Sequence, residues 1–381
     1  MPGLPPRHEL GALTGLRYGA AIWVVLYHFA PIHGSELPRA LHDFIELGYL
    51  AVALFFVLSG FVLAYSYLDA AGRMRADAPS FWVARFARIY PAYLTSFFLS
   101  VPLYVAAKAA TGTSAAVIER TLGTSALYLA LIQAWTPWTA FILNYPAWSL
   151  SAEAFFYLCF PWARRLIRIQ GPTLALAICA CFLLAVIPGT VTFLADPPRH
   201  GDLDASQIFS GVFPLFRFAQ FLLGMFLAKL YRERPSGGRG AKILVNGSIV
   251  VGLATFTRAS KLPIALIEPI ALAVFAALIY GLAYGEGLVA GMLSRRVPML
   301  LGHASYAVYI YQRPLAAYLG LTNSDSWLKV TGYLMVPSAA SIGSVFLIEN
   351  PSRRFVQRWW KARHIAQQET QYKTAVNLGG M

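Results

Sequence analysis

Long runs of apolar residues follow one another along this chain and are separated by short polar connections. Eleven such blocks occur, at about residues 10–30, 47–68, 89–107, 122–143, 147–163, 171–195, 208–228, 243–257, 263–284, 299–320 and 328–348. A helix needs about 20 mostly apolar residues to cross the hydrocarbon core of a bilayer, and most blocks approach that length. The pattern therefore predicts an all-α protein built as a polytopic transmembrane helix bundle.

Composition and charge support this fold class. Of the 381 residues, 57% are hydrophobic and 13% are charged, whereas a soluble domain carries about 25% charged residues. The formal net charge is +14, but the basic residues lie in clusters between the apolar blocks. The positive-inside rule explains such clusters as cytoplasmic loops, so we expect no nucleic-acid partner.

The basic clusters also predict the topology. They occupy residues 73–88, 164–168, 229–242, 295–296 and 353–363, whereas acidic residues mark other connections: Glu36, Asp43, Glu46, Asp196, Asp202, Asp204 and Asp325. All clusters fall on one side of the membrane only if block 122–143 does not cross it. This block contains Trp135, Pro137 and Trp138, which are typical of an interfacial or re-entrant segment. We expect ten spans, one such segment, and both termini in the cytoplasm.

The domain organisation is simple. We expect a transmembrane domain over residues 1–350 and a basic cytoplasmic tail over residues 351–381, with Trp359 and Trp360 in an interfacial helix. The three cysteines lie in apolar blocks without a CxxC motif or a nearby histidine: Cys159, Cys179 and Cys181. We interpret them as packing residues, and we expect neither a metal site nor a tightly bound cofactor.

The first block carries two polar residues that a spanning helix normally excludes, Arg17 and His28. Eleven positions at about 100° each come within about 20° of three full turns, so both residues share one face, about 16 Å apart along the axis. Ionisable residues inside a membrane mark functional sites by default. This face suits an anion bound at Arg17 and a base at His28. The alternative is that Arg17 snorkels to lipid phosphates and His28 is a hydrogen-bonded packing residue.

A second pair of arginines, Arg85 and Arg88, lies where the chain enters the membrane again. Residues three positions apart share a helical face. Two guanidinium groups on one face suit a phosphorylated ligand, through bidentate contacts. The alternative is that both arginines only obey the positive-inside rule.

Two carboxylates lie in or beside apolar blocks. Glu153 lies about two turns into block 147–163 and needs a partner there. We expect that partner to be His28, because a carboxylate fixes the tautomer of an imidazole and raises its basicity; a structural ion pair with Arg217 is the alternative. Glu349 is expected to pair with the arginines that follow it.

Taken together, these segments resemble the membrane acyltransferase family 3, the bacterial integral-membrane O-acyltransferases. The resemblance covers nearly the whole chain. It rests on Arg17 and His28 with ten residues between them, FFVLSGF (55–61), the R-x-x-R-I-x-P run (85–91), WSLSAE (148–153), RFAQFLLGM (217–225), LGHASYAVYIYQRPL (301–315) and the late E-x-P (349–351). One departure is Gln312, where many relatives have histidine.

The resemblance implies transfer of an acyl group, most often acetyl from acetyl-CoA, to a hydroxyl of a carbohydrate or glycoconjugate in the bacterial inner membrane. It implies His28 as the catalytic base, with Glu153 beside it, and Arg17, Arg85 and Arg88 as donor-binding residues. Candidates for contacts with the substrate or the oxyanion are Trp148, Tyr306 and Arg217. The acceptor stays open among exopolysaccharide, lipopolysaccharide, peptidoglycan and small secondary metabolites.

A rival function from another class is a proton-coupled transporter or exporter, in which Glu153, Arg217 and His28 form a proton relay. The absence of a visible inverted repeat in the sequence argues against it.

Overall fold

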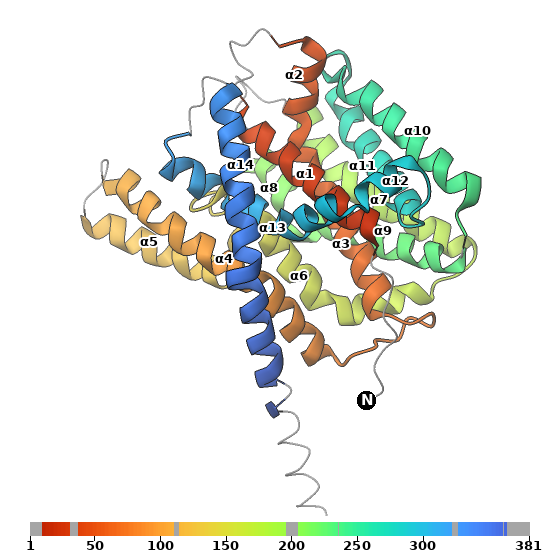
Figure 1. Ribbon diagram of the computed structural model, residues 1–381, viewed down its shortest axis with the longest axis horizontal. Coiled ribbons are helices and arrows are strands. Elements are labelled where there is room, and N and C mark those ends of the chain that lie inside the picture. Colours follow the sequence, from red (N-terminus) through yellow and green to blue (C-terminus); the bar gives the residue numbers. More distant parts are fainter. Residues whose placement is uncertain are drawn as a thin grey trace, which may run out of the picture.

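The computed structural model describes residues 10–30, 37–109, 114–195, 205–234, 236–321, 327–360 and 362–363. Every regular element within these residues is helical (Figure 1), and the one β feature among them is an isolated bridge between Leu68 and Met74. The predicted all-α fold class is therefore confirmed. The loop residues Glu36, Asp196, Asp202, Asp204 and Asp325, and the tail beyond residue 363, lie outside the described residues.

The helices follow the apolar blocks closely. In chain order they are α1 (Gly11–Phe29), α2 (Arg39–Glu46), η1 (Leu47–Leu50), α3 (Ala51–Tyr67), α4 (Ala78–Ala109), α5 (Ser114–Leu129), η2 (Gln133–Trp135), η3 (Tyr145–Ala147), α6 (Trp148–Ala163), η4 (Arg164–Arg168), α7 (Pro172–Ala195), α8 (Ala205–Val212), α9 (Pro214–Glu233), α10 (Gly238–Phe256), η5 (Ala259–Lys261), α11 (Ile264–Leu282), α12 (Leu288–Leu293), α13 (Arg296–Tyr318), α14 (Trp327–Ser344) and the π-helical turn η6 (Val345–Glu349).

The centre of the bundle is formed by α1, α3, α9 and α13 (Figure 1). Helix α3 is apolar on all sides and mostly buried, as a core helix of a large bundle should be. It packs against α9 at a crossing where glycines face backbone. A Cβ on Gly60 would clash with the Phe221 carbonyl, and one on Gly224 would clash with the Val57 carbonyl. Small residues thus let the two backbones approach closely.

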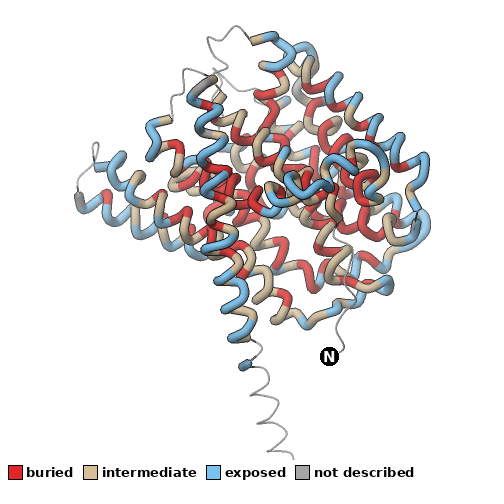
Figure 2. The backbone as a smooth tube through the Cα atoms, viewed as in Figure 1, coloured by how far each residue is buried: buried red, intermediate tan, exposed pale blue. Residues whose placement is uncertain are grey.

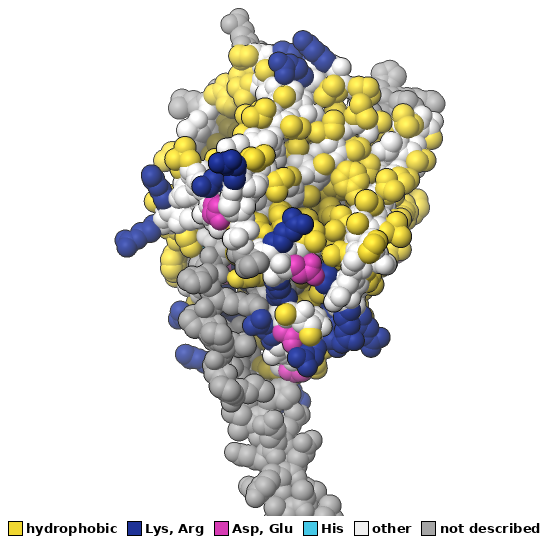
Figure 3. Space-filling view, turned by 90° about the vertical axis from the view of Figure 1, so that its right-hand side faces the viewer, with side chains coloured by type: hydrophobic (Ala, Val, Ile, Leu, Met, Phe, Trp, Pro, Cys, Tyr) yellow, Lys and Arg dark blue, Asp and Glu magenta, His cyan; other side chains and the backbone are white. Residues whose placement is uncertain are grey.

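The outer helices expose apolar side chains. Helix α7 exposes Leu176, Leu184 and Leu194, and α10 exposes Ile243 and Val250. Buried residues lie at the centre of the tube drawing, and exposed residues lie on α5 and α10 at its edge (Figure 2). The face in Figure 3 is a broad area of hydrophobic side chains with Lys and Arg gathered mostly outside it. An apolar exterior of this extent is typical of a protein solvated by lipid.

Six helices of the described chain are long and apolar enough to cross a membrane: Arg39–Tyr67, Ala78–Ala109, Pro172–Ala195, Ala205–Glu233, Ala265–Leu282 and Lys329–Trp360. Helices α1 and α13 are not among them, because polar residues such as Arg17 and Arg313 lower their hydropathy. These six indicate a membrane protein, whereas ten spans with cytoplasmic termini stay a prediction.

Two regions differ in detail from the expected elements. Block 122–143 divides into the end of α5, which packs beside α4, and irregular backbone after Leu129, where Gln133 is fully buried and its amide donates to the Ala147 carbonyl (2.8 Å). The last helix continues from α14 through η6 to residue 360, so residues 350–360 extend the same rod (Figure 1).

Candidate active site

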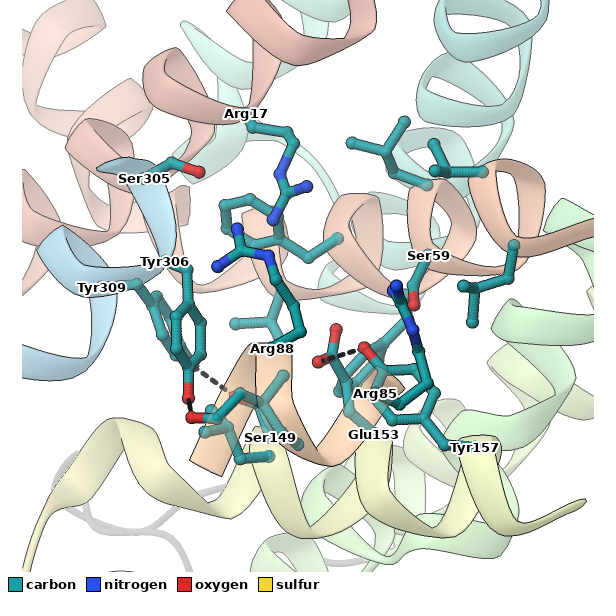
Figure 4. A pocket seen from close by; sticks show the side chains of 18 residues that line it. Arg17, Ser59, Arg85, Arg88, Ser149, Glu153, Tyr157, Ser305, Tyr306 and Tyr309 are labelled. Atoms are coloured by element: carbon teal, nitrogen blue, oxygen red, sulfur yellow. Dashed lines mark hydrogen bonds between the residues drawn. The ribbon is translucent and has the colours of Figure 1, made fainter. Parts of the chain in front are cut away.

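Arg17 and His28, the two polar residues that α1 was predicted to place on one face, line two neighbouring cavities. The first, here called the arginine chamber, has a volume of about 100 Å³ and is lined by Arg17, Ser59, Arg85, Arg88, Glu153, Tyr157, Tyr306 and neighbouring apolar residues (Figure 4). The second, the histidine chamber, has a volume of about 170 Å³ and is lined by residues that include Tyr27, His28, Tyr145, Trp148, Arg217, Gln220 and Glu268. The predicted shared face of α1 thus leads from one chamber to the other.

The arginine chamber is built from distant segments that meet at one cation-rich cavity. Arg17 and Arg88 point toward each other across it (Figure 4), and Nε of Arg17 is buried without a hydrogen-bond partner among the described residues. Arg85 donates to the Tyr67 hydroxyl (3.0 Å). Like charges facing each other in a buried site are costly unless an anion lies between them. The lining carries three arginines and one glutamate, so an anionic group in this chamber would lower that cost.

A carboxylate from the far end of the chain supports Arg88. The π-helical turn η6 brings Glu349, which is 4% exposed, against the Arg88 guanidinium in a short ion pair. π-Helical turns often mark functional sites. The expectation that Glu349 pairs with the arginines after it was wrong, because η6 directs its side chain into the bundle toward α4.

Glu153 also belongs to the arginine chamber. The Tyr157 hydroxyl donates to its carboxylate (2.9 Å), and Ser149, Glu153 and Tyr157 follow one face of α6 toward Arg17 and its neighbours (Figure 4). The expected pair of Glu153 with His28 is not formed between these two described residues. The reason is the rotation of α6 about its axis. Glu153 faces the arginine chamber, whereas the α6 residue that lines the histidine chamber is Trp148. Trp148 precedes Ser149 by one position, which is about 100° around the helix.

His28 instead has Gln312 as its partner. Its Nδ1 lies 2.9 Å from Oε1 of Gln312, and Nε2 of Gln312 donates to the Tyr309 carbonyl (2.7 Å). This second bond orients the amide, so Oε1 can only accept and Nδ1 of His28 must carry the proton. Nε2 is then the unprotonated nitrogen, and it is buried without a partner among the described residues. The unprotonated ring nitrogen thus belongs to a residue that lines the histidine chamber.

The chambers adjoin at three shared residues, Val52, Phe56 and Tyr309. The ring of Tyr145 lies edge-on to His28, with ring centres 5.4 Å apart. Of the three candidates for contacts with the substrate or the oxyanion, Trp148 lines the chamber of His28, and its indole nitrogen forms no hydrogen bond with the described residues. Tyr306 lines the arginine chamber, where its hydroxyl donates to the Ile89 carbonyl (2.6 Å).

Arg217 lies on the far wall of the histidine chamber and is paired there. It donates to Glu268 (2.9 Å) and to the Gly211 carbonyl (2.7 Å). The alternative pair of Glu153 with Arg217 is therefore not formed, and the three residues of the rival relay each have another partner. Sequence reasoning missed Glu268, although its position in the apolar run of α11 signals a buried carboxylate in the same way as Glu153.

A cluster of one histidine and two carboxylates lies outside both chambers. His42, Asp43 and Glu46 bring possible ligand atoms within 4.8 Å of one another. Asp43, however, accepts hydrogen bonds from the backbone and hydroxyl of Ser260 (3.1 and 2.6 Å) and pairs with Arg39 (3.0 Å). These bonds dock the turn at η5 onto α2, which is a structural role.

This all-helical membrane protein holds a buried cationic chamber beside a histidine oriented by Gln312, and both features suit a membrane-embedded enzyme. Comparison with known proteins identifies which one. The family model described as an acyltransferase domain, that of acyltransferase family 3, matches residues 10–348. The chain belongs to this family, which makes it an acyltransferase, as the sequence motifs indicated.

Individual relatives agree. The chain is 30% identical over 380 residues to the acyltransferase MdmB of Streptomyces mycarofaciens, covering 93% of this chain and 95% of that protein. A shorter match, 35% identical over 101 residues, covers 26% of this chain and 48% of protein 2 in the picA locus of Rhizobium radiobacter. No solved structure matches the chain.

Proposed function

We propose that this protein is an acyl-CoA-dependent O-acyltransferase, most simply an O-acetyltransferase, which acylates a hydroxyl of a carbohydrate or glycoconjugate at a bacterial inner membrane. The observation that carries the proposal is the chain of hydrogen bonds from His28 through Gln312 to the Tyr309 carbonyl. It provides an unprotonated Nε2 beside a chamber suited to anions. Acyl transfer from a phosphorylated donor requires these two features together.

The donor fits the arginine chamber. Phosphates of acyl-CoA bind Arg17, Arg85 and Arg88, with Arg88 positioned by Glu349. When no donor is bound, the Glu153 carboxylate balances part of the positive charge of these arginines. The acyl-bearing arm then extends past Val52 and Phe56 into the histidine chamber. In the topology predicted from charge, this route runs from the cytoplasm toward the outer half of the membrane.

The chemistry then follows from the geometry. Nε2 of His28 takes the proton of the acceptor hydroxyl as its oxygen attacks the thioester carbonyl carbon. The Trp148 indole N–H stabilises the oxyanion of the tetrahedral intermediate. The C–S bond breaks, and the CoA thiolate leaves and recovers the proton from His28. The products are an ester and free CoA. A two-step route through acyl-His28 uses the same nitrogen as nucleophile.

The test is purified protein with radiolabelled acetyl-CoA and a crude pool of envelope glycans. We expect label in a product that mild base releases, as an ester requires. His28→Ala should lower the rate by about 10²- to 10⁴-fold, the usual contribution of a general base, while CoA still raises its melting temperature. His42→Asn is the matched control and should keep wild-type activity. Full activity in His28→Ala would remove His28 from the mechanism. Proton-driven uptake in vesicles without CoA would favour the transporter instead.

A further inference from the structure

The far wall of the histidine chamber carries a polar group that the proposed chemistry does not use. Gln220 on α9 lines the chamber and is completely buried, yet neither its amide nitrogen nor its amide oxygen has a hydrogen-bond partner among the described residues. A buried polar group without a partner is destabilising, because it has lost its hydrogen bonds to water. An amide that needs both a donor and an acceptor is satisfied by a hydroxyl, which supplies both.

A second polar group lies on the same wall. Glu268 uses Oε1 to accept from Arg217 (2.9 Å), and its Oε2 forms no hydrogen bond with the described part of the chain. Oε2 lies so close to Gly189 that a Cβ at that position would be 2.8 Å away. A side chain at position 189 would therefore displace the carboxylate from this place on the wall. Glu268 can therefore accept from a second ligand hydroxyl.

The charge of the chamber limits what that ligand is. Arg217 and Glu268 are the charged residues among those described as its lining, and they neutralise each other. The remaining lining is uncharged: it combines apolar residues, rings such as Tyr27, Tyr145 and Trp148, and polar side chains that include Thr190 and Ser210. The contrast with the arginine chamber is direct, since that one has three arginines to one glutamate. The lining offers an anionic acceptor no surplus cation; Arg313, whose guanidinium lies 5.8 Å from the centre of the Tyr145 ring, lines a separate cavity.

We propose that the histidine chamber selects an uncharged acceptor with several hydroxyls: while one hydroxyl faces His28, neighbouring hydroxyls bind the Gln220 amide and Glu268. Arg217 is a positioning residue, which holds Glu268 and balances its charge. This inference rests on the proposed O-acyl transfer and specifies its acceptor as a neutral polyhydroxylated ring.

The test uses paired acceptor probes. Octyl glycosides of glucose, galactose, mannose and rhamnose are the neutral probes, the octyl uronides of the first three are their anionic counterparts, and octanol is the probe with a single hydroxyl. Purified protein in nanodiscs is supplied with radiolabelled acetyl-CoA, and kcat/KM is measured for each probe. We expect the neutral member of at least one pair to exceed its uronide at least tenfold, and to exceed octanol.

Charge variants show whether the chamber causes this selectivity. Glu268→Gln leaves Arg217 uncompensated, so the ratio of neutral to anionic kcat/KM should fall at least about tenfold, since one unbalanced charge in a chamber of lowered dielectric has an effect of this size or more. The double variant Arg217→Gln/Glu268→Gln restores neutrality and should bring the ratio back to within threefold of wild type.

Gln220→Leu should lower kcat/KM for the glycoside at least tenfold without changing that for octanol. A thermal shift with CoA confirms that each variant is folded.

The outcomes separate two failures. Preference of the wild type for a uronide, transfer to octanol alone, or an unchanged ratio in Glu268→Gln would overturn the selection while O-acyl transfer stands. Transfer to none of the hydroxyl probes by a protein that CoA stabilises would overturn the proposed function itself, and this inference with it.

Discussion

Gln312 is the residue that distinguishes an oriented base from a merely buried histidine. Its side chain lines neither chamber, and it contacts His28 only through the 2.9 Å bond to Nδ1. The substitution Gln312→Leu keeps the volume of the side chain and removes the acceptor. Nδ1–H is then buried without a partner, and His28 relieves this by rotating or by moving its proton to Nε2. Either change removes the free base from the chamber.

The magnitude follows from that unsatisfied group. Leaving one buried partner of a hydrogen bond unpaired costs about 1–3 kcal/mol, and the active tautomer and rotamer must be restored against this cost. At about 1.36 kcal/mol per tenfold, kcat should fall about 5- to 160-fold. Most of this range lies below the loss of about 10²- to 10⁴-fold expected for His28→Ala. KM for acyl-CoA and for the acceptor should stay within about twofold, because Gln312 touches neither chamber.

The assay is steady-state transfer from radiolabelled acetyl-CoA, with each substrate varied in turn. Gln312→Glu is the matched control, because its carboxylate still accepts from Nδ1, and it should keep more activity than Gln312→Leu. A folded Gln312→Leu protein with the kcat of the wild type would refute the orienting role. A rise in KM with unchanged kcat would refute it as well, since that result describes a binding residue.

Three further predictions concern the donor site and the bundle. Arg17→Met should raise KM for acyl-CoA about 13- to 160-fold, the cost of losing a charged hydrogen bond of about 1.5–3 kcal/mol, whereas unchanged donor affinity would exclude Arg17 from the site. Arg88→Met leaves the Glu349 carboxylate buried and unpaired, so it should lower the free energy of unfolding by about 3–5 kcal/mol, measured by thermal unfolding. Adding Glu349→Gln should recover part of that loss, and no recovery would mean that the two residues are not coupled. Gly60→Ala should cost about 1–3 kcal/mol by overpacking against α9, whereas Gly19→Ala, where a Cβ meets nothing within 4 Å, should not destabilise the protein; equal melting temperatures would refute the close approach.

The sequence by itself determined the helices, the membrane class and the charged residues that line the arginine chamber. Apolar blocks are a local property, so their lengths predicted nearly every helix of the bundle. The face shared by Arg17 and His28 follows from helical periodicity alone, and the structure opens it into two adjoining chambers. The family followed from the order of short motifs, and its model matches residues 10–348.

The partners of those residues were decided only by the tertiary structure. His28 and Gln312 are 284 positions apart, and Arg88 and Glu349 are 261 apart. Pairing over such distances depends on which helices pack together and on how far each is rotated about its axis, and no periodicity in one segment records either quantity. A rotation of one residue, about 100°, separates Trp148 in the histidine chamber from Ser149 in the other, and Glu153, one turn further on, shares the face of Ser149. For this reason the sequence named Glu153 as the partner of His28, and only the packing of α1 against α13 assigned that place to Gln312.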